Sequence, residues 1–169
     1  MIANTGAAGP SASRRNLVLI ASGRASAYAA CVKLSVKSDY AARALLGLAR
    51  SFQTRAVRRA EDLADEQGVP ANYLVQILIE LKAAHLVNSV RGKEGGYLLA
   101  RQPAEITLGD VLRAIHGNIF DSQALTDSQC PPVLRNAWEK MQEAVSRTAN
   151  AINFQQLLDE ADRSKMYYI

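Results

Sequence analysis

The residues Gly68-Val69-Pro70 restrict the fold of this chain most, because they separate two segments whose apolar residues follow helical spacing. The first segment runs from about Arg59 to Gln67. Gly68 readily takes the positive φ at which many helices end, and Pro70 suits a first helical turn, where an N–H has no intrahelical partner. The sequence therefore predicts two helices joined by a tight turn, with Val69 returning to the core. The predicted inward-facing residues are Ala60, Leu63 and Ala64 in the first helix, and Leu74, Ile77, Leu78 and Leu81 in the second, which extends to about Ala84.

The segment RGKEGGYLLAR, residues 91–101, follows the second helix after a short link. Val87 to Arg91 and Gly96 to Ala100 are predicted to pair as strands, because the glycines between them permit a tight turn. Two helices joined by a short turn and followed by such a hairpin form a winged helix-turn-helix. We therefore predict a mainly α fold with a small β-hairpin wing, in a DNA-binding domain over residues 33–101.

A further helix is predicted ahead of this pair. Ser38 is its expected N-cap, followed by Asp39 in the first turn. Its inward face is predicted to hold Tyr40, Ala44, Leu45, Leu48 and Phe52.

The first 32 residues differ in composition from the rest, with three arginines, no acidic residue and many small side chains. They cannot bury enough apolar surface to stay ordered, so we predict a disordered N-terminal extension over residues 1–32. The stretch SRRNLVLIASGRASAYAAC has the twin arginines of an export signal, but Arg24 interrupts its short apolar run. The alternative is that the native protein starts at Val32.

The charge distribution predicts where nucleic acid would bind. Residues 33–101 carry 11 Lys and Arg against 7 Asp and Glu, whereas residues 102–169 carry 6 against 9. Asn72 and Gln76 offer the donor and acceptor that the major-groove edge of adenine requires, although on an isolated helix they would be ordinary surface groups. Arg91 and Lys93 can neutralise phosphates or enter a narrow minor groove. The predicted DNA-binding set is Lys37, Arg59, Asn72, Tyr73, Gln76, Arg91, Gly92, Lys93, Gly95 and Gly96.

Three segments resemble the Rrf2 family of winged-helix transcription factors, of the iron–sulfur cluster regulator type: KLSVKSDYAARALLGLA (33–49), GVPANYLVQILIELKAAHLV (68–87) and RGKEGGYLLAR (91–101). The likeness extends to about Leu158. It implies a dimeric bacterial regulator that binds palindromic promoter DNA, with Tyr73 and Gln76 on the DNA and Arg91 in the minor groove. Many members have Glu between the Leu and Gln of the YLxQ segment, where this chain has Val75. A base-reading carboxylate is therefore missing, and contact with a thymine methyl becomes an alternative.

Residues 102–169 are predicted to form a sensor loop and dimerisation helices. Thr107 and Asp110 make a capping-box pattern before the helix LGDVLRAIH, which Gly117 ends. After a loop over residues 118–130, Pro131-Pro132 begins a long C-terminal helix with a heptad pattern. Such a helix pairs with a second protomer or packs in its own core, and the attached DNA-binding module favours a homodimer. The predicted dimer seam is Leu134, Trp138, Met141, Val145, Thr148 and Ile152, and Phe154, Leu157 and Leu158 are predicted to pack back as a short terminal helix.

The loop before the long helix bears on cofactor binding. The resemblance implies three cysteines there for an iron–sulfur cluster, but DSQALTDSQC holds Cys130 alone. We therefore expect no cofactor, since the ordinary three-cysteine site is incomplete. An unusual cluster that adds Asp121, Asp127 or His116 to Cys130 is the alternative. Cys130 itself is either a reactive thiol favoured by the dipole of the following helix or a small buried side chain.

No enzyme motif is present in the sequence: it lacks a supported Ser/His/Asp arrangement, a metal-binding His/Cys pair and the lysine of a phosphate loop. It also lacks an apolar run of about 18 residues, and two cysteines are too few for a disulfide framework, so we predict a cytoplasmic protein that does not span a membrane. The predicted function is that of a dimeric repressor, redox- or sulfur-responsive through Cys130. The competing interpretation is a winged-helix module that binds another protein instead of DNA.

Overall fold

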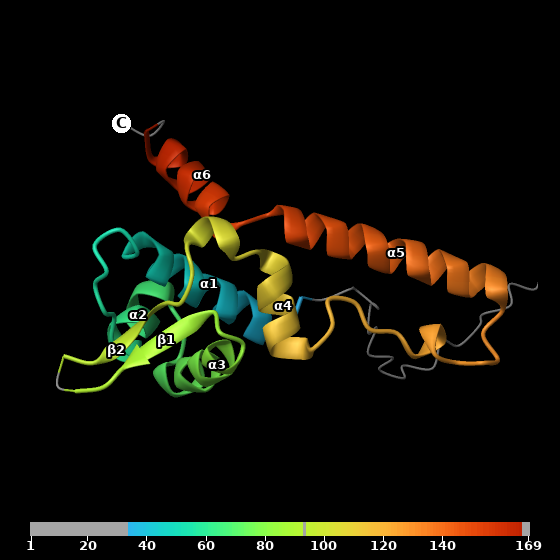
Figure 1. The fold of residues 1–169 in the computed structure, drawn as a ribbon, viewed down its shortest axis with the longest axis horizontal. Helices are drawn as coiled ribbons and strands as arrows, with labels where there is room; N and C mark the ends of the chain where they lie inside the picture. Colours follow the sequence, from blue (N-terminus) through green and yellow to red (C-terminus); the bar gives the residue numbers. More distant parts are fainter. Residues whose placement is uncertain (1–33, 93, 167–169) are drawn as a thin grey trace, which may run out of the picture. The chain divides into compact units, whose positions relative to one another are not determined.

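The computed structural model describes residues 34–92 and 94–166 (Figure 1). The predictions for residues 1–32 and for Lys93 lie outside these described residues. The elements follow one another as α1 (Val36–Arg50), α2 (Ala60–Gln67), α3 (Ala71–Ala83), β1 (Val87–Val90), β2 (Gly96–Leu99), the 3-10 helix η1 (Pro103–Glu105), α4 (Leu108–His116), the 3-10 helix η2 (Gln123–Leu125), α5 (Pro132–Ala151) and α6 (Phe154–Met166). The mainly α fold with a small hairpin wing is thereby confirmed.

The N-cap of the first helix lies three residues before the predicted one. Ser35 is the N-cap of α1, and its Oγ accepts a hydrogen bond from the Ser38 backbone N–H at 3.0 Å. The prediction that Ser38 caps the helix is therefore wrong. Either serine could cap a helix by its chemistry, but Ser38 lies inside the first turn and is buried.

The turn between α2 and α3 has the predicted geometry. Gly68 follows α2 in the left-handed conformation, with φ of 64°, and its N–H reaches back to the carbonyl groups that end the helix. Val69 is buried and donates its N–H to the Ala64 carbonyl at 2.9 Å. Pro70 is the N-cap of α3, one position before the expected first turn. The predicted inward faces of α2 and α3 are all buried.

The wing is an antiparallel pair in which Val87 lies opposite Leu99 and Val90 opposite Gly96. A third segment, absent from the sequence prediction, extends it. Arg58 and Tyr97 exchange backbone hydrogen bonds of 2.9 and 2.8 Å, so the chain just before α2 lies along the outer edge of β2. Gly96 is required here, because a Cβ at this position would collide with the Arg58 carbonyl oxygen. The wing is therefore tied to the start of the helix-turn-helix.

The core is shared by the helix-turn-helix and the C-terminal half. Leu45 and Leu48 of α1, the buried residues of α3, and Phe154 of α6 belong to one cluster. Phe154 is fully buried, and its N–H donates to the Ile106 carbonyl at 3.0 Å. Leu157 and Leu158 pack against the same cluster, as predicted for a terminal helix that folds back. Movement of the C-terminal half is thus coupled to the packing of α1.

The long helix α5 begins at Pro132 as predicted but ends at Ala151. Ile152 is extended, and its carbonyl accepts from the Leu108 N–H at 2.9 Å. The prediction that Ile152 lies within the long helix is therefore wrong, because its carbonyl pairs with Leu108, the first residue of α4, instead. No helix in the described part of the chain combines the length and the hydropathy of a membrane span.

Candidate nucleic-acid interface

The recognition helix α3 divides into a buried face and an exposed polar face. Leu74, Ile77, Leu78 and Leu81 are fully buried, whereas Asn72, Tyr73 and Gln76 are exposed near the start of the helix. Hydrogen-bonding groups at the N-terminal end of a recognition helix are placed to meet base edges in a major groove. The structure therefore brings three of the predicted DNA-binding residues onto one surface.

Tyr73 is held by an aromatic neighbour from the first helix. Its ring packs edge-on against Tyr40, with centroids 5.9 Å apart and planes at 78°. The Arg43 guanidinium lies 5.8 Å from the Tyr40 ring centroid and also pairs with Asp39 at 2.7 Å. Edge-to-face pairs of this kind stabilise an orientation beyond simple burial. Tyr73 is therefore presented in a fixed position, and no sequence motif indicated the role of Tyr40.

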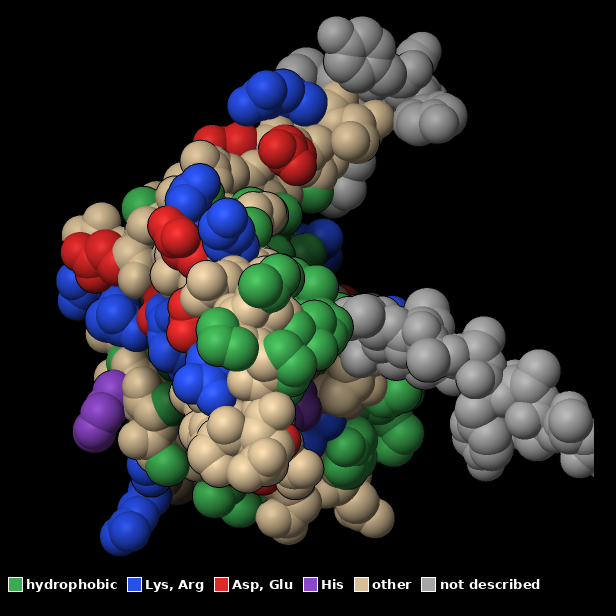
Figure 2. All heavy atoms as spheres, turned by 90° about the vertical axis from the view of Figure 1, so that its right-hand side faces the viewer, with side chains coloured by type: hydrophobic (Ala, Val, Ile, Leu, Met, Phe, Trp, Pro, Cys, Tyr) green, Lys and Arg blue, Asp and Glu red, His purple; other side chains and the backbone are tan. Residues whose placement is uncertain are grey.

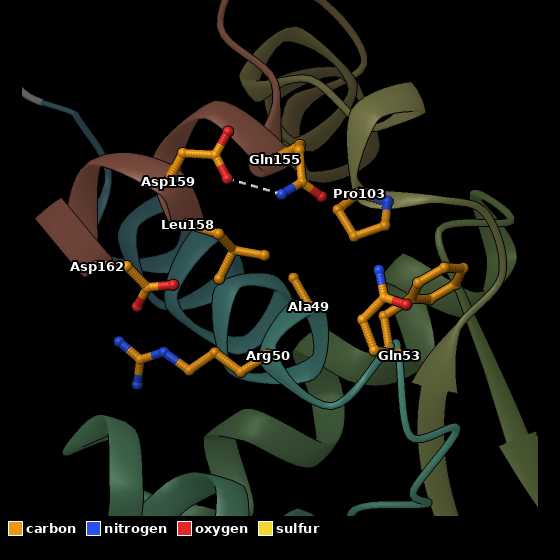
Figure 3. A pocket seen from close by; sticks show the side chains of 9 residues that line it. Ala49, Arg50, Gln53, Pro103, Gln155, Leu158, Asp159 and Asp162 are labelled. Atoms are coloured by element: carbon orange, nitrogen blue, oxygen red, sulfur yellow. Dashed lines mark hydrogen bonds between the residues drawn. The ribbon is translucent and has the colours of Figure 1, made fainter.

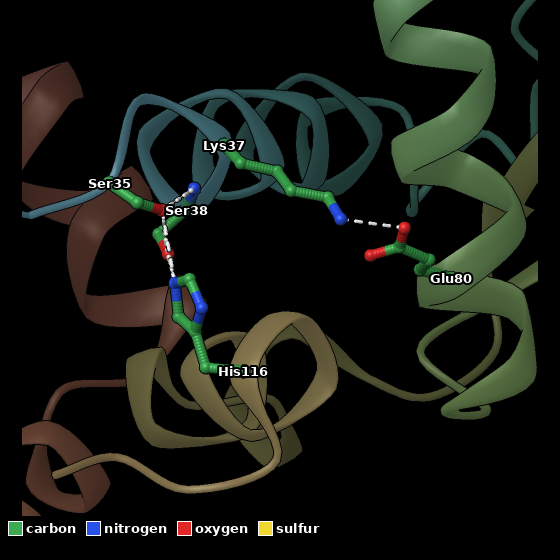
Figure 4. A network of polar contacts seen from close by, with 5 residues as sticks. All are labelled: Ser35, Lys37, Ser38, Glu80 and His116. Carbon is green, nitrogen blue, oxygen red and sulfur yellow. Dashed lines mark hydrogen bonds and ion pairs between the residues drawn. The ribbon is translucent and has the colours of Figure 1, made fainter. Parts of the chain in front are cut away.

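Lys37 is engaged within the protein. Its Nζ lies 2.7 Å from Glu80 Oε1, so the ammonium of α1 neutralises the one acidic residue of α3 (Figure 4). A phosphate contact would require this pair to open or to be shared. The structure thus shows Lys37 in an ion pair with Glu80, and its predicted DNA-binding role stays a prediction.

An open groove separates α3 from the wing. It is lined by Arg59, Glu61 and Val75, and by Gly92, Gly95 and Gly96 of the hairpin. Val75 is half-buried, packs against the core and lines this groove. Arg59 is exposed at the N-cap position of α2. The groove brings α2, α3 and the wing together around one space.

The wing tip carries Arg91 on an exposed position beside Gly92. Gly92 has a φ of 121°, a conformation that side-chain-bearing residues rarely adopt. A Cβ on Gly95 would lie 2.5 Å from the Val90 carbonyl oxygen. These glycines therefore allow the tight turn that the sequence predicts.

An ionic network stabilises the base of the wing. Arg58 Nη2 donates to Glu66 Oε2 at 2.6 Å, and Arg50 Nη1 lies 3.3 Å from Glu66 Oε1. The hydrogen bond from Arg58, with support from Arg50, lowers the pKa of Glu66 below its ordinary value despite partial burial. The sequence did not predict this network, because its members are separated along the chain and meet only after α1 and α2 pack.

His116, the last residue of α4, precedes the predicted sensor loop and contacts the start of α1. His116 Nε2 lies 2.7 Å from Ser38 Oγ and 3.0 Å from Ser35 Oγ, at the start of α1 (Figure 4). Cys130 is buried and free, and its thiol lies 3.8 Å from the Pro131 carbonyl oxygen. Arg135 donates to the carbonyl groups of Asp127 at 2.6 Å and Cys130 at 3.4 Å, which fixes the end of the loop.

This donor set does not fit an ordinary iron–sulfur cluster. Iron–sulfur clusters are held mainly by cysteine thiolates, and the loop supplies one. His116 is directed at the serines of α1, and within residues 34–92 and 94–166 no three His, Cys, Asp or Glu side chains gather as metal ligands. The unusual cluster with Asp121 or Asp127 therefore has no assembled site in the described chain.

The long helix leaves apolar side chains in solvent. Leu134, Met141 and Val145 are exposed, Trp138 is half-buried, and Thr148 is exposed. Figure 2 looks toward the end of the molecule where α5 begins, and apolar side chains gather on that end. Farther along α5, an open apolar groove runs between α4 and α5 and is lined by Leu108, Leu112, Ala144, Val145, Thr148, Ala149 and Ile152.

A separate polar hollow lies between α1, η1 and α6. Arg50 and Gln53 border it on one side, and Asp159 and Asp162 on the other (Figure 3). Gln155 donates to Asp159 at 2.9 Å across its rim. It lies apart from the groove between α3 and the wing, since the two share no lining residue.

Comparison with known proteins places this geometry in a family. The family model described as "Iron-dependent Transcriptional regulator" matches residues 34–160. A helix-turn-helix-type transcriptional regulator of Mycobacterium tuberculosis is 46% identical over 86 residues, which cover 51% of this chain and 53% of that protein. The matched part is thus about half the length of the mycobacterial relative. The regulator CymR of Bacillus subtilis is 29% identical over 141 residues, which cover 82% of this chain and all of CymR.

Solved structures of the same kind share the fold. The structure of IscR from T. potens has a TM-score of 0.66 and 32% identity, and covers 83% of this chain and 99% of that chain. The structure of CymR, described as the global cysteine regulator of B. subtilis, has a TM-score of 0.68 and 28% identity, and covers 77% and 98%. These relatives are transcriptional regulators and not enzymes, in agreement with the prediction from motifs. The chain belongs to the Rrf2 family of winged-helix transcriptional regulators.

Proposed function

We propose that this chain is a sequence-specific regulator that binds promoter DNA as a homodimer, with α3 in the major groove and the wing over the adjacent minor groove. The observation that carries the proposal is the uncharged polar surface of Asn72, Tyr73 and Gln76 beside a glycine-rich wing tip with Arg91. Base edges require neutral donors and acceptors, whereas phosphates require cations. The neutral polar groups lie on α3 and the cation lies on the neighbouring wing, so both can contact the same DNA duplex.

The proposed homodimer forms along α5. The apolar side chains of Leu134, Met141 and Val145 are exposed in the single chain, and a helix with such a stripe is stabilised by a second helix packed against it. The groove between α4 and α5 offers room for side chains from the partner. A two-fold dimer presents two copies of α3 to half-sites about one helical turn apart, which accounts for a palindromic operator.

Repression is the proposed outcome of binding, because a dimer seated on a promoter excludes other proteins from the same DNA. The proposed signal acts through Cys130, which joins the loop over residues 118–130 to α5. Cys130 is 7% exposed, so modification of its thiol by an oxidant or a sulfur species would displace the packing between loop and helix.

The role of Cys130 is tested by comparing the full chain with Cys130→Ser. DNA affinity is measured before and after treatment with hydrogen peroxide or a persulfide donor. The proposal predicts a change in affinity for the wild type and none for Cys130→Ser. An equal response in both proteins would remove the thiol from the mechanism.

DNA binding itself is tested by its dependence on salt. Neutralised phosphates release counterions, so the logarithm of the binding constant should fall linearly with the logarithm of salt concentration. Arg91→Ala should lower the slope by about 1, since one phosphate contact is lost. A protein-binding module would show no such slope with any DNA fragment, and that result would favour the competing interpretation.

A further inference from the structure

The exposed face of α3 contains one large aliphatic side chain besides the ring of Tyr73. Ile79 is 52% exposed, although its neighbours Ile77 and Leu78 are fully buried. Ile79 lies three residues after Gln76, so both side chains project from the same side of the helix. At 3.6 residues per turn, Ile79 falls between Val75 and Gln76 around the helix axis. It therefore lies near the centre of the face that the proposed function turns toward DNA.

Packing among residues 34–92 and 94–166 does not explain this exposure. Among the described residues, the core members of α3 are Leu74, Ile77, Leu78 and Leu81, and Ile79 belongs neither to the core nor to the residues packed against it. Val75, by contrast, is packed against the core and lines the groove beside the wing. Exposing an apolar side chain to water costs free energy that a binding partner recovers by covering it. Ile79 is the side chain of α3 that such a partner would cover.

The surrounding charges suit an uncharged contact at this position. Glu80 would repel a nearby phosphate, but Lys37 neutralises it at 2.7 Å. Lys82 donates to Ser89 Oγ at 2.6 Å and is thereby directed toward the wing. Asn72 and Ala83, which continue the same face in both directions, are uncharged and exposed. The centre of this face thus matches base edges and not the DNA backbone.

We propose that Ile79 reads a thymine, by packing against the C5 methyl group in the major groove. Thymine is the one base with an apolar group on that edge, so an exposed isoleucine beside Gln76 can distinguish it from the other three. Three residues of α-helix advance about 4.5 Å, somewhat more than the roughly 3.4 Å between base pairs. Ile79 therefore contacts a base pair one or two steps from the one that Gln76 contacts. The inference rests on the proposed function and adds a specificity-determining residue to it.

The test is a double-mutant cycle: the thymine methyl group and the Ile79 side chain are removed separately and together. The operator is first selected from random DNA with the wild-type chain, and each thymine is then replaced singly by deoxyuridine, which lacks only the methyl. Affinities are measured for the wild type, Ile79→Val and Ile79→Ala. Val133→Ala, in which an equally apolar and 84% exposed residue of α5 is shortened, is the matched control.

The expected result is one thymine per half-site whose replacement weakens wild-type binding by roughly three- to fivefold, the value of one buried methyl-sized group. Ile79→Ala should lose the same factor on the unmodified operator and show no further loss with deoxyuridine. Ile79→Val should retain most of the sensitivity, and Val133→Ala all of it. Equal deoxyuridine effects in the wild type and Ile79→Ala would overturn the role of Ile79. Failure to select any operator would instead contradict the proposed function.

Discussion

At the scale of single residues, the interface separates base reading from phosphate binding. Gln76 is exposed on α3 and offers both a donor and an acceptor, whereas Lys93 belongs to the wing segment and carries only a charge. We predict that Gln76→Ala costs roughly 1–3 kcal/mol on the cognate operator and relaxes specificity at one position. Competition binding against operators with single base changes measures both effects.

Lys93→Ala should behave differently, because a phosphate contact carries no sequence information. It should weaken binding to operator and random DNA by about the same factor and reduce the salt slope by about 1. If Gln76→Ala and Lys93→Ala lose affinity equally on both kinds of DNA, the division of roles is wrong.

The spacing of the sequence predicted which residues of α3 are exposed, but it did not predict the contacts that surround them. The periodicity of α3 predicted that Leu74 is buried and Gln76 is exposed, and both predictions are confirmed. The hydrogen bond from Lys37 to Glu80, at 2.7 Å and between residues 43 positions apart, was not predicted. Contacts between residues far apart in sequence depend on how helices cross, and no local pattern encodes the crossing.

At the scale of elements, α4 depends on its cap. Thr107 and Asp110 form the predicted capping box, and Arg113 Nη2 lies 2.9 Å from Asp110 Oδ1. Partial burial acts to raise the pKa of Asp110, but the hydrogen bonds from Thr107 and Arg113 outweigh it, so the pKa lies below the ordinary 3.8. The carboxylate therefore adds stability that is present above pH 3.8 and lost as the pH falls through the lower folded-state value.

We predict that Asp110→Asn lowers the free energy of unfolding by about 1 kcal/mol at neutral pH, as loss of a helix cap does. Because the variant lacks the titrating group, its stability should fall less steeply below pH 3.8 than that of the wild type. Thermal unfolding across a pH series measures the difference. If the stability of the two proteins fell equally steeply below pH 3.8, Asp110 would not titrate as described.

The seam of α5 makes a prediction about assembly. Val145 lies on the exposed apolar stripe, and burying an unpaired carboxylate there would cost a few kcal/mol. Val145→Glu should therefore weaken dimerisation by about a hundredfold or more, as measured by sedimentation equilibrium. Asn136→Glu makes the same change of charge at an exposed position outside the seam and should leave the dimer intact. Equal effects of the two variants would argue against α5 as the dimer interface.

The elements themselves were predictable to within a few residues, since each has a local signal. Gly68, the capping box and Pro131-Pro132 mark their boundaries correctly. Two features had no local signal. Ile152 leaves the helix because its carbonyl pairs with Leu108, and Arg58 pairs with Tyr97 to widen the wing. Both are backbone contacts between distant segments, which helical periodicity does not report.

At the scale of the whole molecule, the predicted DNA-binding and sensor halves share one core. Phe154 packs with α1 and α3, and His116 contacts the first turn of α1 at Ser38. The two elements that flank the loop and α5 in the chain, α4 and α6, therefore both contact α1, the helix whose Tyr40 packs against Tyr73. This continuity supports a regulator in which the C-terminal half controls the presentation of the recognition helix.

The most direct measurement of the central claim is to incubate the full chain with fragmented genomic DNA of its source and to sequence the retained fragments at low and at moderate salt. The proposed regulator predicts a palindromic sequence enriched in promoter regions, with half-sites about one helical turn apart and a weaker yield at higher salt. No enriched sequence at low salt from folded protein would contradict sequence-specific DNA binding.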